Sequence, residues 1–190
     1  RKLKLPFVVH GRTSDPEDSF SWVDVNNRRA FYKAATHLLE AGHRRIGLIN
    51  GWEYMTFALK RREGLETALR QNGIEPDPEI MVSSEMIEPN GHGAMKAFLA
   101  HRDPPTAVLC SSMLTAMGAS RAVHESGMEL GRDISLIGYD DCLSFLPAAG
   151  EYPSMTVMQS SIRLAGKHCA DMLIDLIDGN AGHRNLLLEA

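Results

Sequence analysis

The chain has 190 residues, of which 44% are hydrophobic, 23% charged and 6% aromatic, and this balance excludes a disordered chain and predicts a soluble globular protein. Twenty Lys and Arg against 24 Asp and Glu leave a formal net charge of -4, which offers no basic surface to nucleic acid or to an anionic membrane. No apolar run is long enough to span a membrane, and the length allows one large domain or two small lobes.

Short β-rich runs alternate with helix-length stretches along the whole chain, which indicates βαβ units and a mostly parallel sheet. The predicted strands are residues 7–10, 22–25, 46–50, 80–83, 107–111, 134–139 and 155–157, with a further candidate at 184–188. Helices are expected in the gaps between the strands.

The stretch from Asn27 to Ala41 carries a one-sided hydrophobic stripe, as expected for a helix that packs on a sheet. Gly42 then supplies a residue that ends a helix readily. Three more helices begin near Thr56, Ser112 and Ser160 and are closed by Asn72-Gly73, Ser126-Gly127 and Asp178-Gly179.

The cysteines Cys110, Cys142 and Cys169 are odd in number and widely spaced, so they predict neither a disulfide framework nor a zinc site. Cysteines that form no disulfides are typical of a protein in a reducing cytoplasm. The chain opens on Arg1 rather than Met, without a signal-peptide core, and we expect it to be a fragment of a longer protein.

The motifs of common enzymes are absent. No strand is followed by G-x-G-x-x-G or G-x-x-x-x-G-K-[ST], and no G-x-S-x-G occurs, so we predict no enzyme, no catalytic residue and no cofactor. His37 and His43 are not spaced four apart as helical metal ligands are, and we predict no metal site.

Two charged segments remain as candidates for binding. In Lys60-Arg61-Arg62 the central arginine points away from its neighbours on a helix, so its guanidinium can face a cleft. Asp140 and Asp141 follow the predicted strand at 134–139, at the edge of the sheet where ligands bind. Taken singly, each of these carboxylates fits a turn cap equally well.

Five segments resemble, in order, the motifs of one bacterial family. They are HLLEAGHRRI (residues 37–46), RREGLETAL (61–69), PTAV (105–108), DISLIGYDD (133–141) and PSMTVMQ (153–159). They resemble motifs of the lactose-repressor/galactose-repressor (LacI/GalR) family of transcriptional regulators, and the resemblance covers essentially the whole chain.

Two departures from the family pattern matter. Where the family has A-N-D-x-x-A-x-G, this chain reads SSMLTAMG (residues 111–118), so Ser112 and Met113 replace Asn and Asp. The polar contacts to the effector change accordingly, and we expect an effector other than a simple hexose. The family's helix-turn-helix head, its hinge helix and its first three βα units are not in this sequence.

The resemblance implies an α/β fold of the periplasmic-binding-protein type, with two doubly wound parallel-sheet lobes and an incomplete N-terminal lobe. Residues 1–42 and 160–188 would form the N-terminal lobe, and residues 43–159 the C-terminal lobe. The implied function is that of a cytoplasmic, homodimeric regulator, a repressor, which binds operator DNA through the missing head. A small-molecule effector, a carbohydrate, would bind between the lobes and control that DNA binding.

Two other classes of protein stay open. A periplasmic sugar-binding protein of a transport system has the same fold, and a secretory signal instead of a helix-turn-helix would identify it. An enzyme on this scaffold would need a nucleophile or a metal near Asp140. The segment at residues 37–46 favours the repressor over the transport protein.

The effector site is predicted at the carboxyl ends of the strands. We expect Asp140 and Arg61 to be the main polar anchors, with Ser112 and His92 lining the same cleft, because all four follow strands of one parallel sheet. A carboxylate or a guanidinium can hold two neighbouring hydroxyls of a sugar.

The remaining predicted contacts come from one arginine and three aromatic rings. Arg12 follows the first strand, so it would approach the effector from the opposite lobe. The apolar face of a sugar would be covered by Trp52, Tyr54 or Phe57.

Overall fold

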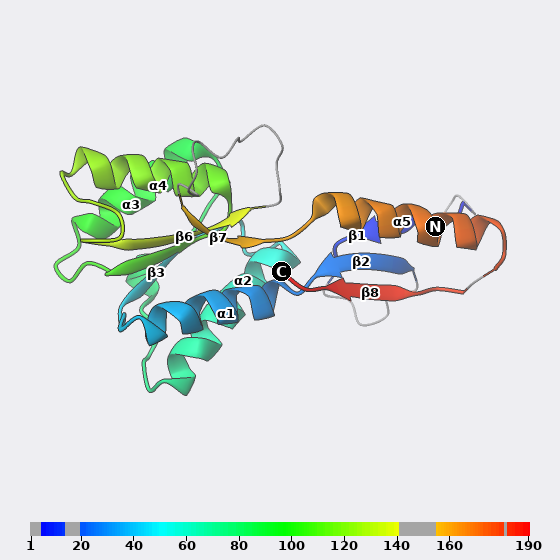
Figure 1. The fold of residues 1–190 in the computed structure, drawn as a ribbon, viewed down its shortest axis with the longest axis horizontal. Coiled ribbons are helices and arrows are strands. Elements are labelled where there is room, and N and C mark those ends of the chain that lie inside the picture. Colours follow the sequence, from blue (N-terminus) through cyan, green and yellow to red (C-terminus); the bar gives the residue numbers. More distant parts are fainter. Residues whose placement is uncertain (1–4, 14–19, 141–154, 181) are drawn as a thin grey trace.

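The computed structural model describes residues 5–13, 20–140, 155–180 and 182–190, and it shows an α/β protein with two parallel sheets (Figure 1). This confirms the predicted fold class. In chain order the elements are β1 (Val8–His10), β2 (Ser21–Val25), α1 (Asn27–Glu40), β3 (Ile46–Asn50), α2 (Thr56–Gln71), a 3-10 turn (Pro78–Ile80), β4 (Met81–Ser83), α3 (Glu88–Leu99), β5 (Ala107–Cys110), α4 (Met113–Glu125), β6 (Ser135–Asp140), β7 (Thr156–Gln159), α5 (Ile162–Ile177) and β8 (Asn185–Leu188).

The predicted strands lie within two residues of their expected bounds. Four helices end on a glycine with positive φ, as the sequence predicted, at Gly42 (96°), Gly73 (72°), Gly127 (75°) and Gly179 (70°). Helix α3 ends differently, because its C-cap residue Ala100 is followed by His101 and not by a glycine of positive φ.

The smaller sheet has three parallel strands in the order β1-β2-β8. Its central strand, β2, pairs with β1 near the start of the chain and with β8 near its end, so Trp22 lies beside both Val9 and Asn185. Helix α5 covers one face, where Ala165 and Met172 pack on Val23. These elements form the first lobe.

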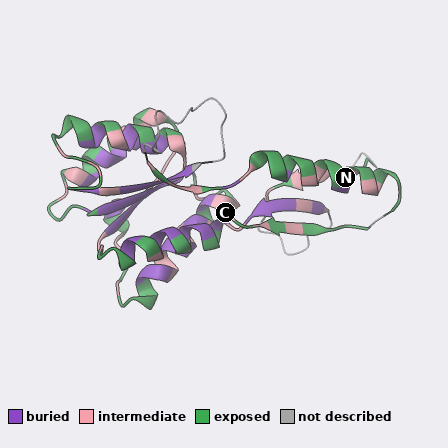
Figure 2. Ribbon diagram, in the orientation of Figure 1, coloured by how far each residue is buried: buried purple, intermediate pink, exposed green. Residues whose placement is uncertain are grey.

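The larger sheet has five parallel strands in the order β4-β3-β5-β6-β7, and helices cover both of its faces (Figure 1). Along β3, Leu48 belongs to the core under α1 and α2, whereas the next residue, Ile49, belongs to the core under α3 and α4. This alternation explains why the strands read as continuous apolar runs. Figure 2 shows the burial concentrated along these strands and on the inward sides of the helices.

Helix α1 packs with the larger sheet. Phe31 and Leu38 of α1 share one core with Leu48 of β3 and Leu109 of β5. Helix α1 also lies directly on α2, because a Cβ atom added at Gly64 would stand 2.9 Å from the backbone nitrogen of Tyr32.

The predicted division after Gly42 differs from this packing, because it separates α1 from the core that α1 covers. We propose instead that the chain leaves the first lobe after Val25 and returns to it after Gln159. The second lobe then consists of α1 and the elements from β3 to β7. The stripe of α1 predicted a helix on a sheet, but it could not indicate which sheet.

Three segments lie together where the lobes meet. The chain crosses at residues 25–27 and at residues 159–161, and the end of β8 runs beside the first crossing. The backbone nitrogen of Asn26 donates to the carbonyl oxygen of Leu188 at 2.7 Å. The lobes are therefore joined by short connections without a long linker.

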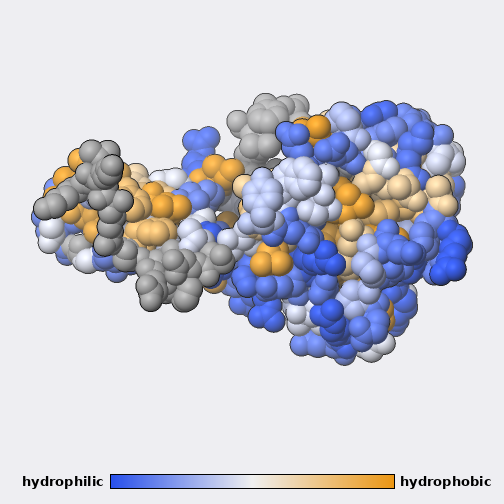
Figure 3. All heavy atoms as spheres, turned by 180° about the vertical axis from the view of Figure 1, so that it is seen from behind, coloured by the Kyte–Doolittle hydropathy of each residue, from blue (hydrophilic) through white to orange (hydrophobic). Residues whose placement is uncertain are grey.

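Several large hydrophobic side chains of the first lobe are exposed, and Figure 3 shows hydrophobic residues gathered on one face of it. They include Leu5, Phe7, Ile162, Leu164, Ile174, Ile177 and Leu187. None of the helices in the described ranges has the length and apolar character needed to cross a membrane.

Candidate functional site

A cavity of about 240 Å³ lies between the two lobes, and both lobes contribute to its wall. The first lobe contributes His10, Gly11, Asp24, Val25, Ser161, Ile162 and Ala165. The crossings and the second lobe contribute Asn27, Phe57, Arg61, Met86, Ser111, Ser112, Tyr139 and Ser160.

The cavity lies at the carboxyl ends of strands from both sheets. Gly11 follows β1, Val25 ends β2, Ser111 follows β5, Tyr139 is the last but one residue of β6, and Ser160 follows β7. Open parallel sheets bind ligands at this edge. The predicted location of the site therefore coincides with a cavity.

Arg61 is the central polar group of this cavity. It lies on the buried face of α2 with Ala58, Leu65 and Ala68, and only 6% of its surface is exposed. Its Nε atom donates to Oδ1 of Asn27 at 2.8 Å, and one terminal nitrogen donates to the carbonyl oxygen of Ser111 at 2.5 Å. Charge-assisted hydrogen bonds of this kind offset the cost of burying the guanidinium.

Three aromatic rings surround the Arg61 guanidinium. Its central carbon lies 3.8 Å from the ring centroid of Tyr139, 5.0 Å from that of Phe57 and 5.3 Å from that of Phe31. Each ring face attracts the cation, most strongly where water is excluded. The guanidinium is therefore fixed in position before any ligand arrives.

Ser112 has two roles in the structure. It lines the cavity, as predicted, and it is also the N-cap of α4, where its Oγ accepts from the backbone nitrogen of Thr115 at 3.2 Å. The neighbouring Ser111 is buried, and its Oγ donates to Oδ1 of Asn50 at 2.6 Å.

Asp24 lines the cavity from the first lobe, where its side chain is 11% exposed. One carboxylate oxygen accepts from Nε of Arg12 at 2.8 Å, and the other accepts from the backbone nitrogen of Val25 at 2.8 Å. Arg12, the predicted contact from this lobe, is not among the lining residues. Its guanidinium is held by Asp24 and stands 5.1 Å from the centroid of the Trp22 ring.

Three other predicted residues are placed away from the cavity. His92 lies in α3 and pairs through Nε2 with Glu125 of α4 at 2.7 Å. Trp52 and Tyr54 stack on each other with ring centroids 6.4 Å apart, and both are exposed. Of the three predicted aromatic residues, Phe57 is the one that lines the cavity.

Asp140 is the last residue of β6, and its backbone pairs with Gln159 of β7. Its side chain lies outside the described residues, as does Asp141. The proposed role of Asp140 as an anchor therefore stays a prediction.

Several lining residues were not predicted, although they obey the rule that selected Asp140. Val25 ends β2, Asp24 immediately precedes it, and Ser160 and Ser161 directly follow β7, so all four lie at carboxyl ends of strands. Asn27 is different, since it is the first residue of a helix and nothing in its own pattern indicates a role.

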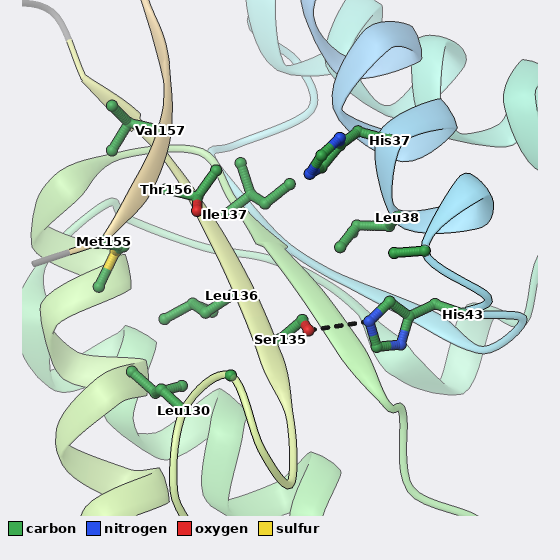
Figure 4. Close-up of a pocket in the computed structure, with 12 residues that line it drawn as sticks. His37, Leu38, His43, Leu130, Ser135, Leu136, Ile137, Met155, Thr156 and Val157 are labelled. Atoms are coloured by element: carbon green, nitrogen blue, oxygen red, sulfur yellow. Dashed lines mark hydrogen bonds between the residues drawn. The ribbon is translucent and has the colours of Figure 1, made fainter. Parts of the chain in front are cut away.

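A larger cavity of about 580 Å³ lies in the second lobe, beside β6 and β7 (Figure 4). Ser135 and Thr156, the first residues of these strands, belong to its mostly apolar lining. It is thus at the amino ends of the strands, opposite to the edge where parallel sheets bind ligands. We therefore take the cavity between the lobes as the candidate site.

The larger cavity also contains a histidine that joins strands of the second lobe. His43 is hydrogen-bonded through Nε2 to Oγ of Ser135 at 2.9 Å (Figure 4). Its Nδ1 atom is hydrogen-bonded to Oγ1 of Thr106, also at 2.9 Å. Burial lowers the pKa of His43, which favours the neutral imidazole.

The described part of the chain offers neither a metal site nor a reactive thiol. No three His, Cys, Asp or Glu side chains there lie together as metal ligands. Burial raises the pKa of the Cys110 thiol, so this cysteine stays protonated and unreactive.

Comparison with known proteins gives consistent matches over most of the chain. A family model described as a periplasmic binding protein-like domain matches residues 35–190. The HTH-type transcriptional regulator AglR of Rhizobium meliloti is 44% identical over 174 residues, which are 92% of this chain and 49% of AglR. The HTH-type transcriptional regulator CelR of Thermobifida fusca is 32% identical over 176 residues, which are 92% of this chain and 51% of CelR.

Among solved structures, a complex of a transcriptional regulator CelR with cellobiose matches with a TM-score of 0.87 and 31% identity. The match covers 97% of this chain and 56% of the CelR chain. The chain described here spans about half the length of the curated relatives that it matches.

Proposed function

Because this chain belongs to the LacI/GalR family through its periplasmic binding protein-like domain, we propose that it is the effector-sensing part of a transcriptional repressor. A small molecule binds between the lobes, and its binding changes the angle between them. Another part of the protein, which binds operator DNA, responds to that change. The chain binds the effector and releases it unchanged, without catalysing a reaction.

The observation that carries this proposal is the shared cavity. Its wall takes Asp24 and Val25 from one lobe and Arg61 and Ser112 from the other, so a ligand that fills it contacts both. A ligand shifts the equilibrium between open and closed lobes only if it makes different contacts in the two states. A cavity that both lobes must complete meets this condition.

We propose that the effector is a carbohydrate. The described lining is rich in groups suited to hydroxyls, since it combines the guanidinium of Arg61 with the carboxylate of Asp24 and four serines. Phe57 adds an aromatic ring beside them. The structure of CelR with cellobiose, on the same fold, supports this choice of ligand class.

A thermal-shift screen of neutral mono- and disaccharides tests the proposal. A ligand at 100 times its dissociation constant raises the free energy of unfolding by ~2.7 kcal/mol, which is readily seen as a higher melting temperature. The matched control is an Arg61→Ala variant, whose melting temperature should not respond to the same sugar. If no carbohydrate stabilises the wild-type protein, the proposed ligand class is wrong.

Operator DNA is bound, in this proposal, by a helix-turn-helix head outside these 190 residues, and the protein works in the cytoplasm where the DNA is. The net charge of -4 and the description of the relatives as HTH-type regulators support this. In a mobility-shift experiment at physiological salt, residues 1–190 should not retard a duplex. Sequence-specific retardation would place the DNA-binding function within these residues.

We also propose that the full-length protein is a homodimer formed through its lobes. Leu114 and Met117 of α4 are 42% and 45% exposed, and they lie on one side of the helix at i, i+3 spacing. Light scattering of the full-length protein at tens of micromolar should give a dimer with and without reducing agent. A monomer, or a dimer that reducing agent dissociates, would contradict this.

A further inference from the structure

We propose that Asp24 determines the charge of the effector, so that the cavity accepts neutral sugars and rejects sugar acids. This inference rests on the proposed function and concerns the same cavity. Its basis is a carboxylate in the first lobe that lines the cavity while both of its oxygens are held by neighbouring donors.

The carboxylate of Asp24 belongs to the cavity wall. Asp24 is 7% exposed as a residue, and it precedes Val25, the last residue of β2 and another part of the wall. A carboxylate has about four acceptor sites on its two oxygens. Two of them are used by Arg12 and by the backbone nitrogen of Val25, so acceptor capacity remains for hydroxyl groups of a ligand.

The carboxylate of Asp24 is held in place by Arg12. Nε of Arg12 donates to Oδ2 of Asp24 at 2.8 Å, while the Arg12 guanidinium stands over the ring of Trp22. Arg12 itself does not line the cavity. It acts as a positioning residue that fixes the carboxylate, and this support makes a partly buried acceptor effective in binding.

The described cavity wall carries one negative and one positive side chain of fixed charge, Asp24 and Arg61. Among the described lining residues, two belong to the types Asp, Glu, Lys and Arg. They are Asp24 and Arg61, and they come from opposite lobes. A neutral sugar can donate hydroxyls to the first and accept from the second. An anionic sugar would bring a second negative charge to the wall that holds Asp24, where little water screens the repulsion.

The test compares neutral sugars with sugar acids by calorimetric titration. The probes are glucose, galactose, cellobiose, maltose and lactose, with glucuronate and galacturonate as the anionic counterparts. Asp24→Asn keeps the shape of the side chain and removes its charge. The matched control is Asp175→Asn in the same lobe, which also breaks an ion pair with an arginine, Arg184, but lies outside the cavity.

The wild-type protein and Asp175→Asn should bind at least one neutral probe and bind the uronates at least ten times more weakly. Asp24→Asn should bind that neutral probe about 10- to 150-fold more weakly, as expected for loss of a hydrogen bond to a charged group. Its preference for the neutral probe over the matching uronate should fall. Circular dichroism and melting temperature establish that the variant is folded, and Asp24→Glu should recover part of the discrimination.

Unchanged affinity in a folded Asp24→Asn variant would overturn the role of Asp24 and leave the proposed sensing of sugars intact. Binding of uronates in preference to neutral sugars by the wild-type protein would overturn the charge selection. If no probe of either charge binds the wild-type protein, the proposed carbohydrate ligand class is wrong, and this inference fails with it.

Discussion

The Arg61 guanidinium is joined to the crossing between the lobes through a single side chain, that of Asn27. Oδ1 of Asn27 accepts from Nε of Arg61 at 2.8 Å, and Nδ2 of the same amide donates to the carbonyl oxygen of Val25 at 3.0 Å. Val25 ends a strand of the first lobe, whereas Arg61 belongs to a helix of the second. Asn27 therefore connects the centre of the cavity to the point about which the lobes would turn.

Asn27→Ala should lower the free energy of unfolding by about 1 to 3 kcal/mol, because it leaves a donor of the buried Arg61 without this acceptor. Urea unfolding followed by circular dichroism measures the loss. Asn90→Ala is the control, since Asn90 also bonds a backbone carbonyl near the start of a helix but does so at the surface. Equal losses in the two variants would show that the link to Arg61 contributes nothing.

Arg61→Lys should weaken binding of any sugar identified by the thermal-shift screen about 10- to 100-fold, although the charge is kept. Lysine has no planar group to lie among the rings of Tyr139, Phe57 and Phe31, and it cannot reproduce two donors in a fixed fork. Calorimetry is the measurement. Arg62→Lys serves as control, because Arg62 pairs with Glu53 and Glu66 outside the cavity and its replacement should leave the affinity unchanged.

Asp140→Ala should reduce affinity for the same sugar about 10- to 150-fold if the carboxylate accepts hydroxyls of the ligand. The reason is the position of Asp140 at the carboxyl end of β6, next in sequence to Tyr139, which lines the cavity. A folded Asp140→Ala variant with an unchanged dissociation constant would leave this residue as a turn cap.

Gly64→Ala should destabilise the protein by about 1 to 3 kcal/mol, because the added methyl group would collide with the backbone of α1 at Arg28 and Tyr32. Gly93→Ala provides the contrast. No atom lies within 4 Å of a Cβ placed there, and alanine favours the helix by about 1 kcal/mol. If both variants unfold at the same urea concentration, the close contact between α1 and α2 is not formed in solution.

His43 should make the protein less stable as the pH falls. Burial lowers the pKa of His43 below its ordinary value of 6.5, so the unfolded chain takes up a proton more readily than the folded protein. The stability from this residue is complete above pH 6.5 and is lost as the pH falls through the lowered folded pKa. Between about pH 7.5 and 5.5, the melting temperature of the wild type should therefore fall more steeply than that of His43→Gln.

His101 should change the stability of the protein with pH in the opposite direction to His43. A hydrogen bond to Glu79 raises the pKa of His101, so its stabilisation is present below pH 6.5 and is lost as the pH rises through the raised folded pKa. The melting temperature of His101→Gln should approach that of the wild type as the pH rises. A common trend in both variants would mean that other groups dominate the titration.

The succession of strands and helices along the chain, and the bounds of the strands, could be predicted from sequence, because alternation of apolar runs with glycine-terminated helices is a local pattern. The lining of the cavity between the lobes could be predicted in part for the same reason. Phe57, Arg61 and Ser112 follow strands that reach the middle of the larger sheet, and the structure places all three in the wall.

The positions of His92 and Arg12 outside the cavity wall depend on information that the local pattern does not contain. His92 follows β4, as does Met86, which lines the cavity, but His92 lies within α3 and pairs with Glu125 of α4. The packing of α3 beside α4, which the sequence does not state, thus decides the partner of His92. Arg12 follows β1, and its ion pair with Asp24 of β2 depends on the pairing of β1 with β2.

The parallel pairing of β2 with β8 has a consequence for synthesis of the protein. Trp22 lies beside Asn185, although nearly the whole chain separates them in sequence, whereas the five strands of the larger sheet lie between residues 46 and 159. A growing chain can thus complete the larger sheet before β8 has been synthesised and has paired with β2. Closing so long a loop is slow compared with local pairing, so an early nascent chain exposes the edge of β2 that later pairs with β8. The finished second lobe would then hold β2 in the position where β8 can pair with it.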